Sequence, residues 1–161
     1  MFKWFSKKEQ VLEELSLSKI GTDLHSHLIP GIDDGARDME ASILLIKKFI
    51  DLGFKKIITT PHIMSDLYQN TPEIINSGLS KLKQELIKQE IDIIVEAAAE
   101  YYVDYNFEQK IGTEKFMTFG DKNILIEFSF LEAPRNMYDI IFKLQLEGYK
   151  IVLAHPARYR Y

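Results

Sequence analysis

Short runs of β-branched and other apolar residues alternate with amphipathic segments along the chain, and this alternation constrains the fold more than any other feature. The expected strands span residues 22–24, 55–60, 91–99, 123–128 and 150–154, and the expected helices span residues 40–52, 71–89, 106–111 and 136–146. Parallel neighbouring strands need a crossover connection, which is usually a helix. The sequence therefore predicts an α/β fold with a parallel sheet of five strands.

The length leaves two versions of that fold open. A complete eight-fold barrel of strands and helices needs ~250 residues, whereas this chain has 161. The expected fifth strand ends close to Tyr161. We therefore expect either an open five-stranded sheet or an incomplete barrel.

Helix boundaries are marked by their usual capping residues. Gly53 stands where a helix commonly stops, and Thr71-Pro72-Glu73 has the N-cap, first-turn proline and early acid of a helix start. Helix 40–52 is expected to carry four apolar residues on or near one face, namely Ile43, Leu44, Ile46 and Ile50. Helix 71–89 is expected to bury the stripe Ile75, Leu79, Leu82 and Leu86.

Composition excludes several classes of function. The net charge of −4 and a pI near 5.6 argue against a general nucleic-acid binder, which usually carries a basic stripe. The absence of cysteine removes thiolate zinc sites and any cysteine nucleophile, so a phosphatase of this sequence cannot use a thiolate. No apolar run approaches the ~20 residues of a membrane span, and no signal peptide is recognisable. We expect a cytoplasmic protein.

The chemistry-bearing residues gather at the predicted strand ends. All four histidines follow a strand, one acid follows the third strand, and another lies near the end of the fourth. In parallel α/β folds this edge is where sites are built. A single histidine after a strand is more often a loop or core residue, but the whole set indicates a common pocket. Its members are His25, His27, His62, His155, Glu100 and Glu127.

The spacing of these residues favours metal binding. His25 and His27 are alternate residues, which point to the same side of an extended segment and can grip one ion. In the following Asp33-Asp34-Gly35, we interpret Asp34 as a ligand and Asp33 as a turn residue. Glu127 lies in an apolar strand, where an unpaired carboxylate costs several kcal/mol.

Four imidazoles and three carboxylates without sulfur suit Mn, Fe, Co or Zn rather than Ca. The number of ligands exceeds what one ion takes, so more than one metal ion is expected.

The motifs resemble those of the PHP (polymerase and histidinol phosphatase) family, and within it the bacterial tyrosine-protein phosphatases of capsular and exopolysaccharide gene clusters. The matching stretches, in the family's order, are Asp23-Leu-His25-Ser-His27-Leu-Ile-Pro-Gly-Ile-Asp-Asp34-Gly, Thr59-Thr-Pro-His62, Ala99-Glu100-Tyr-Tyr, Leu125-Ile-Glu127-Phe and Ala154-His155-Pro-Ala-Arg158-Tyr. The resemblance implies a distorted (β/α)7 TIM-like barrel, here incomplete with about five βα units. Residues 21–161 would form the N-terminal two-thirds of the phosphatase domain, and residues 1–20 an N-terminal extension.

The same resemblance implies a site for up to three metal ions, usually manganese. By analogy, His25 and His27 bind the first ion, and Glu100 bridges the first and second ions. Glu127 and His155 are the other ligands of the second ion. Asp34 and His62 bind the third ion. Arg158 matches the family's phosphate-binding arginine.

The implied activity is hydrolysis of phosphotyrosine in the tail of a kinase that controls polysaccharide export. This sequence differs from the family pattern in two places: Ala157 replaces a family glutamate, and no Asp-x-His motif follows His155. A PHP phosphoesterase acting on a small monoester such as histidinol phosphate, or an inactive metal-binding fragment, are the alternatives. Without the last motif we expect weak activity, fewer than three metals, and self-association through an open fifth-strand edge.

Overall fold

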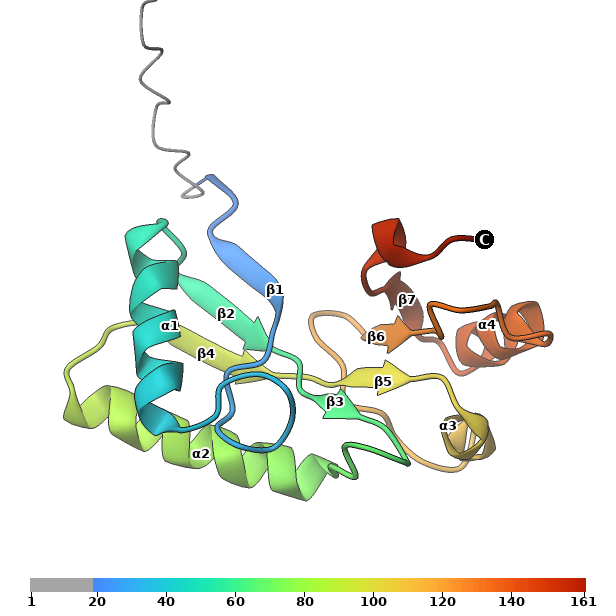
Figure 1. Cartoon of the computed structure of the whole chain (residues 1–161), viewed down its shortest axis with the longest axis horizontal. Coiled ribbons are helices and arrows are strands. Elements are labelled where there is room, and N and C mark those ends of the chain that lie inside the picture. The colour runs from blue at the N-terminus through green and yellow to red at the C-terminus, as the bar shows by residue number, and fades with distance from the viewer. Residues whose placement is uncertain (1–18) are drawn as a thin grey trace, which may run out of the picture.

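The computed structural model describes residues 19–161, which form two parallel sheets with helices packed against them (Figure 1). The first sheet has the order β1-β2-β4 and the second the order β3-β5-β6-β7, and every pairing between these strands is parallel. The strands are β1 (Thr22–Ser26), β2 (Lys56–Thr59), β3 (His62–Ile63), β4 (Ile94–Ala97), β5 (Glu100–Tyr102), β6 (Asn123–Glu127) and β7 (Lys150–Leu153). The predicted α/β class with parallel strands is confirmed, and residues 19–161 close no barrel.

Two of the five predicted strands are each followed, after two residues, by a second and shorter strand that the sequence did not predict. Thr60 and Pro61 separate β2 from β3, and Ala98 and Ala99 separate β4 from β5. The break is a bend rather than an end, because the Ala98 amide donates to Thr59 O (2.9 Å) and the Glu100 amide donates to Pro61 O (3.0 Å). Pro61 has no N–H to donate to a ladder. The two sheets therefore adjoin at this bend.

This bend corrects the sequence prediction in two places. Residues 91–93 were expected in a strand but precede β4, because the Ile91 amide donates to Leu86 O and closes the preceding helix. Glu100 and His62, expected just after strands, instead begin the short strands β5 and β3. They are paired directly with each other in register.

Four α-helices connect the strands: α1 (Met39–Asp51), α2 (Pro72–Lys88), α3 (Tyr105–Lys110) and α4 (Met137–Leu146). A 3₁₀ turn, Pro156–Arg158, follows β7. Side-chain caps begin three of the helices. Asp38 accepts from Ala41 N, Thr71 from Ile74 N, and Asp104 from Phe107 N. The predicted cap at Thr71 is confirmed.

The predicted core stripes are largely confirmed. Ile43 and Ile46 of α1 and Ile75, Leu82 and Leu86 of α2 are buried. Leu44, which is predicted on or near the same face as Ile43 and Ile46, is 56% exposed, because the buried residues of α1 are Ser42, Ile43 and Ile46.

Side chains alternate between the two faces of the sheets, and this alternation places Glu127. Ile124 and Ile126 of β6 belong to the cluster that packs with α4, whereas Leu125 belongs to a separate cluster with Ile58 and Ala154. Since successive strand residues point to opposite faces, Glu127 shares the side of Leu125, away from the helices.

Within residues 19–161, no helix is both long and apolar enough to cross a membrane. The expected extension of residues 1–20 lies, apart from its last two residues, outside the described residues.

Candidate metal centre

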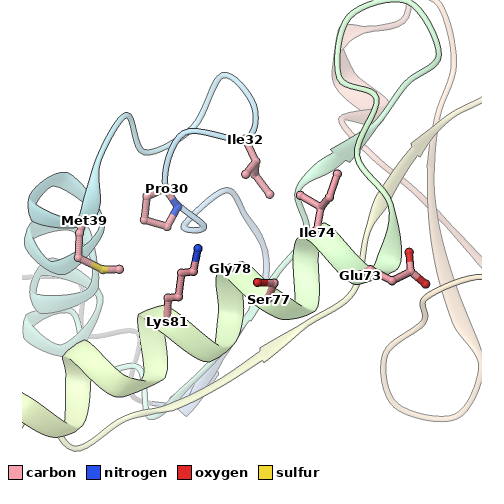
Figure 2. Close-up of a pocket in the computed structure, with 8 residues that line it drawn as sticks. All are labelled: Pro30, Ile32, Met39, Glu73, Ile74, Ser77, Gly78 and Lys81. Atoms are coloured by element: carbon pink, nitrogen blue, oxygen red, sulfur yellow. The ribbon is translucent and has the colours of Figure 1, made fainter.

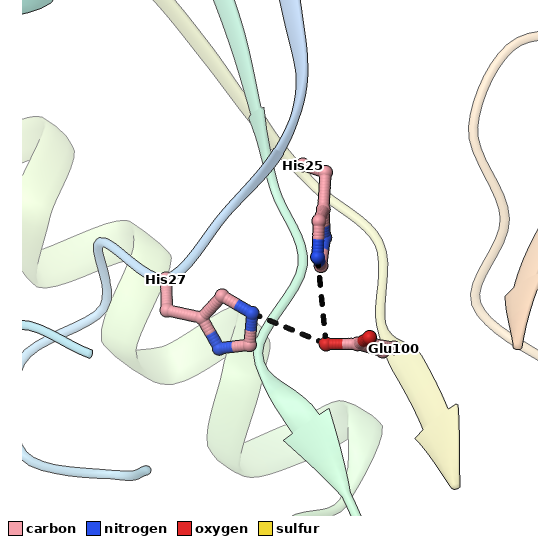
Figure 3. A group of neighbouring side chains, drawn as sticks. All are labelled: His25, His27 and Glu100. Atoms are coloured by element: carbon pink, nitrogen blue, oxygen red, sulfur yellow. Dashed lines mark ion pairs between the residues drawn. The ribbon is translucent and has the colours of Figure 1, made fainter. Parts of the chain in front are cut away.

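Glu100 is at the centre of the site, and all four histidines surround it. Its Oε2 lies 3.2 Å from His27 Nε2, 3.3 Å from His62 Nδ1 and 3.7 Å from His25 Nε2 (Figure 3 shows His25, His27 and Glu100). Its Oε1 lies 3.2 Å from His155 Nε2. The Glu100 side chain is fully buried, and neither carboxylate oxygen has a hydrogen-bond partner among the described residues.

Two of these histidines are oriented by hydrogen bonds on their outer nitrogens. His25 Nδ1 lies 2.7 Å from Thr60 Oγ1, and His27 Nδ1 lies 2.7 Å from Asp33 Oδ2. A carboxylate partner at Nδ1 places the imidazole proton there and leaves the Nε2 lone pair free. Both Nε2 atoms point to Glu100, so the side chains are arranged as metal ligands are.

Asp34 and Glu127 extend the site on either side of His62. Asp34 Oδ1 lies 3.6 Å from His62 Nε2, and Glu127 Oε2 lies 3.9 Å from His62 Nδ1. Three groups place their donor atoms within 4.8 Å of one another, namely His25–His27–Glu100, His27–Asp34–His62 and His62–Glu100–Glu127. His155 joins them through Glu100 and through its 3.2 Å approach to His25 Nε2. The structure thus brings all seven predicted residues together.

Backbone packing holds the segment that carries His25 and His27. Thr59 is fully buried, donates its hydroxyl to Ser26 O and accepts from the Leu28 amide, both at 2.9 Å. Gly35 passes so close to His27 that a Cβ there would overlap the His27 carbonyl oxygen and Cβ. A residue larger than glycine therefore cannot occupy position 35 without moving the ligand loop.

Burial and neighbouring charge shift the pKa values of the acids in opposite directions. Burial acts to raise the pKa of Glu100, but contact with His27 and the positive potential of His25 and His62 outweigh it and lower the pKa. Burial raises the pKa of Glu127 to about 7, and the negative charge of Glu100 acts in the same direction. Two buried carboxylates this close need a cation to be ionised together.

The histidines show the same competition. Burial lowers the pKa of His25 and of His62. Burial would also lower the pKa of His27, but its hydrogen bond to Asp33 and its contact with Glu100 raise that pKa to about 9. A divalent ion would take the place of the extra proton that His27 otherwise holds.

His155 has a strained backbone. Its φ and ψ are both 47°, in the left-handed region that non-glycine residues rarely adopt, and Pro156 follows it. The turn is closed by the Arg158 amide, which donates to His155 O at 2.8 Å. This conformation brings His155 to Glu100, and it leaves Arg158 exposed beside the site.

A family model described as capsular polysaccharide synthesis, CpsB/CapC, matches residues 21–161. The chain belongs to this family. The similarity to capsule-type tyrosine phosphatases that the motifs predict is thereby confirmed.

Two bacterial tyrosine-protein phosphatases are similar over most of this chain. Tyrosine-protein phosphatase YwqE of Bacillus subtilis (strain 168) is 36% identical over 139 residues, which cover 86% of this chain and 55% of YwqE. Tyrosine-protein phosphatase CpsB of Streptococcus agalactiae is 27% identical over 138 residues, which cover 85% of this chain and 57% of CpsB.

A crystal structure of this group shows the same fold. It comes from work on YwqE from Bacillus subtilis and CpsB from Streptococcus pneumoniae, described as unique metal-dependent tyrosine phosphatases. It matches with a TM-score of 0.79 at 36% identity, covering 86% of this chain and 57% of the solved chain. The chain therefore spans a little over half the length of the relatives that it matches.

Three residues make contacts at this site that the sequence does not predict. Asp33 has the predicted turn role, because its side chain accepts from the Gly35 amide, but it is only 1% exposed and also accepts from His27 and from the His62 amide. Thr60 contacts His25, and the Tyr68 ring stacks on His62 with centroids 5.3 Å apart and planes 9° apart. No sequence motif or spacing predicts the contacts of Asp33 with His27, of Thr60 with His25 or of Tyr68 with His62.

A cleft of about 430 Å³ between α1, α2 and the loop at Pro30 is a separate feature (Figure 2). Its lining is mainly apolar, with Met39 and Ile74 on opposite helices, and Glu73 is its only acid. It contains no histidine and none of the predicted site residues. The cleft is therefore not the metal centre.

Proposed function

We propose that this chain carries most of the metal centre of a metal-dependent phosphatase that hydrolyses phosphotyrosine. The observation that carries the proposal is Glu100, a fully buried carboxylate with no hydrogen-bond partner among the described residues and with four imidazoles around it. A buried charge of this kind needs cations. The named relatives, which are tyrosine-protein phosphatases, support the choice of reaction.

The donor set fits divalent cations, with manganese as the proposed ion and iron, cobalt or zinc as chemically suitable substitutes. His25 and His27 would hold one ion, which Glu100 would share with a second. The further ligands would be Glu127 and His155 for the second ion, and Asp34 and His62 for a third. The 3.9 Å separation of His62 Nδ1 from Glu127 Oε2 also allows His62 to contribute to the second ion.

Bound cations would activate a water for attack on phosphorus and neutralise the phosphoryl oxygens. The side chains of the protein then have separate tasks. Arg158 would bind the phosphoryl oxygens with its guanidinium fork. Asp33 and Thr60 would hold His27 and His25 in their ligand orientation. With no cysteine in the sequence, the reaction would not pass through a cysteinyl phosphate on this chain.

The wider setting is proposed on the same basis. Residues 21–161 would correspond to the N-terminal part of a distorted (β/α)7 barrel. The all-parallel strands, with helices on one face and the Ile58–Leu125–Ala154 cluster on the other, support this. The substrate would be the phosphotyrosine-bearing tail of a tyrosine kinase that controls polysaccharide export. The family description, capsular polysaccharide synthesis, supports this substrate.

The test is turnover and metal content measured on the same manganese-loaded samples. Wild type, Glu100→Gln and the exposed control Glu147→Gln are assayed on a phosphotyrosine peptide and on histidinol phosphate. We expect peptide hydrolysis by wild type and control, and loss of both turnover and bound metal in Glu100→Gln. Faster hydrolysis of histidinol phosphate than of the peptide would show that the enzyme acts on small phosphate monoesters instead of phosphotyrosine. Metal binding without hydrolysis of either substrate would contradict the proposed activity.

A further inference from the structure

The guanidinium group of Arg158 lies on an aromatic ring, and its positive charge also reaches Glu127, whose pKa it acts to lower. Its Cζ is 4.3 Å from the centre of the Phe130 ring. Across residues 19–161, no carboxylate forms an ion pair with Arg158, whereas Arg37 does pair with Asp38. Arg158 is exposed, so without the ring its long side chain would sample many conformations.

Phe130 is itself tied to the metal centre. Its ring centroid lies 6.4 Å from that of His155 and 5.5 Å from that of Tyr159. The loop that carries Phe130 is joined to the chain end twice, because the Phe128 amide donates to Tyr159 Oη (3.1 Å) and Tyr161 Oη donates to Ser129 O (2.9 Å). The position of the ring relative to His155 is therefore set by contacts on both sides.

The Phe130 ring has little part in the core. It is half-buried, and it belongs to none of the three clusters of buried residues found among the described residues. Its neighbour Phe128 fills the core and is 3% exposed. A purely structural role would not require an aromatic side chain at position 130.

Stacking on a ring has a specific chemical consequence for an arginine. A carboxylate partner would occupy two of the five guanidinium N–H donors and offset the positive charge. An aromatic ring contacts only the flat face of the guanidinium, so all the donors stay in the plane and the charge stays available to an anion.

We infer that Phe130 is a positioning residue for phosphate recognition: it holds the Arg158 guanidinium beside the histidine–carboxylate centre with its donors free for the phosphoryl group. The inference rests on the proposed phosphatase function, and it assigns a task to a side chain outside the ligand set. Phe130 is not a proposed metal ligand, and it would act on the phosphate through Arg158.

The experiment is a double-mutant cycle read out by binding of inorganic phosphate to the manganese-loaded protein. Phe130→Leu keeps an apolar side chain but removes the ring, and we expect it to weaken phosphate binding about two- to five-fold. Phe130→Tyr should restore wild-type affinity. In an Arg158→Ala background, Phe130→Leu should have no further effect, because the two side chains act as one unit. Phe142→Leu, at an exposed phenylalanine on α4, is the matched control.

Bound manganese and the NMR signal of Arg158 distinguish a loss of arginine positioning from a loss of metal. Bound manganese should be unchanged in all Phe130 variants, and the NMR signal of the Arg158 Nε–H should lose its ring-current shift in Phe130→Leu and keep it in Phe130→Tyr. Equal loss of affinity from Phe130→Leu with and without Arg158 would overturn the inference, as would unchanged affinity in Phe130→Leu. Phosphate binding with the expected cycle but no phosphotyrosine hydrolysis would count against the proposed function alone.

Discussion

Asp33 is predicted to control metal affinity although it is not itself a proposed ligand. Its side chain accepts three hydrogen bonds, from His27 Nδ1 at 2.7 Å and from the amides of Gly35 and His62, each at 3.0 Å. Asp33→Asn keeps the shape of the side chain but removes the charge that fixes the His27 proton on Nδ1. His27 can then adopt the tautomer whose Nε2 carries the proton and cannot bind an ion.

The expected size of the effect follows from the kind of hydrogen bond that the substitution removes. Replacing the outer hydrogen-bond partner of a metal-binding histidine typically weakens metal affinity 10- to 100-fold, which is about 1.4 to 2.7 kcal/mol. We expect Asp33→Asn to fall in this range for the first manganese ion, measured by calorimetric titration. Asp66→Asn, at an exposed acid of a neighbouring loop, should bind as wild type does.

The same variant has a distinct signature in the metal-free protein. The folded pKa of His27 is about 9, above its usual 6.5, so its contribution to stability is fully present below pH 6.5 and is lost as pH rises through about 9. The free energy of unfolding of the wild type should therefore fall between pH 6.5 and 9, and Asp33→Asn should flatten this fall. Unchanged manganese affinity together with an unchanged pH slope would refute the role assigned to Asp33.

Three other substitutions test separate parts of the site and core. Gly35→Ala should weaken manganese binding and lower the melting temperature, because the new Cβ would overlap the His27 backbone; wild-type values for both would contradict the close approach. Thr60→Val removes the partner of His25 Nδ1 and should weaken manganese binding about tenfold in the same titration, so equal affinity would show that the hydroxyl is dispensable. Leu82→Ala, at a fully buried side chain, should cost about 2–5 kcal/mol in urea unfolding, and a decrease under about 1 kcal/mol would show that this core collapses around the gap.

Much of the fold could be predicted because it depends on local patterns. The helix start at Thr71 and the apolar stripe of α2 follow from capping chemistry and helical spacing, and the structure has both. The position of Glu127 on the face away from the helices follows from strand alternation. Glu127 and His155 lie at the carboxyl ends of parallel strands as predicted, whereas His62 and Glu100 meet as register partners at the bend between the two sheets.

The remaining features depend on contacts that local patterns do not encode. The short strands β3 and β5 beyond the bend at Pro61 and Ala98–Ala99 depend on backbone hydrogen bonds between chain segments far apart in sequence. The Asp33–His27 bond lies inside a tight loop whose path depends on Gly35. The ring under Arg158 comes from a loop between β6 and α4, and no motif links Phe130 to it.

The most direct test of the metal centre is electron paramagnetic resonance of the protein titrated with manganese. If Glu100 is shared by two ions, they lie about 3.5–4 Å apart and should give the broadened spectrum of a spin-coupled pair. Glu100→Gln should abolish this coupling, while Glu147→Gln should retain it. A six-line spectrum from isolated manganese at every stoichiometry of the wild type would contradict the shared site.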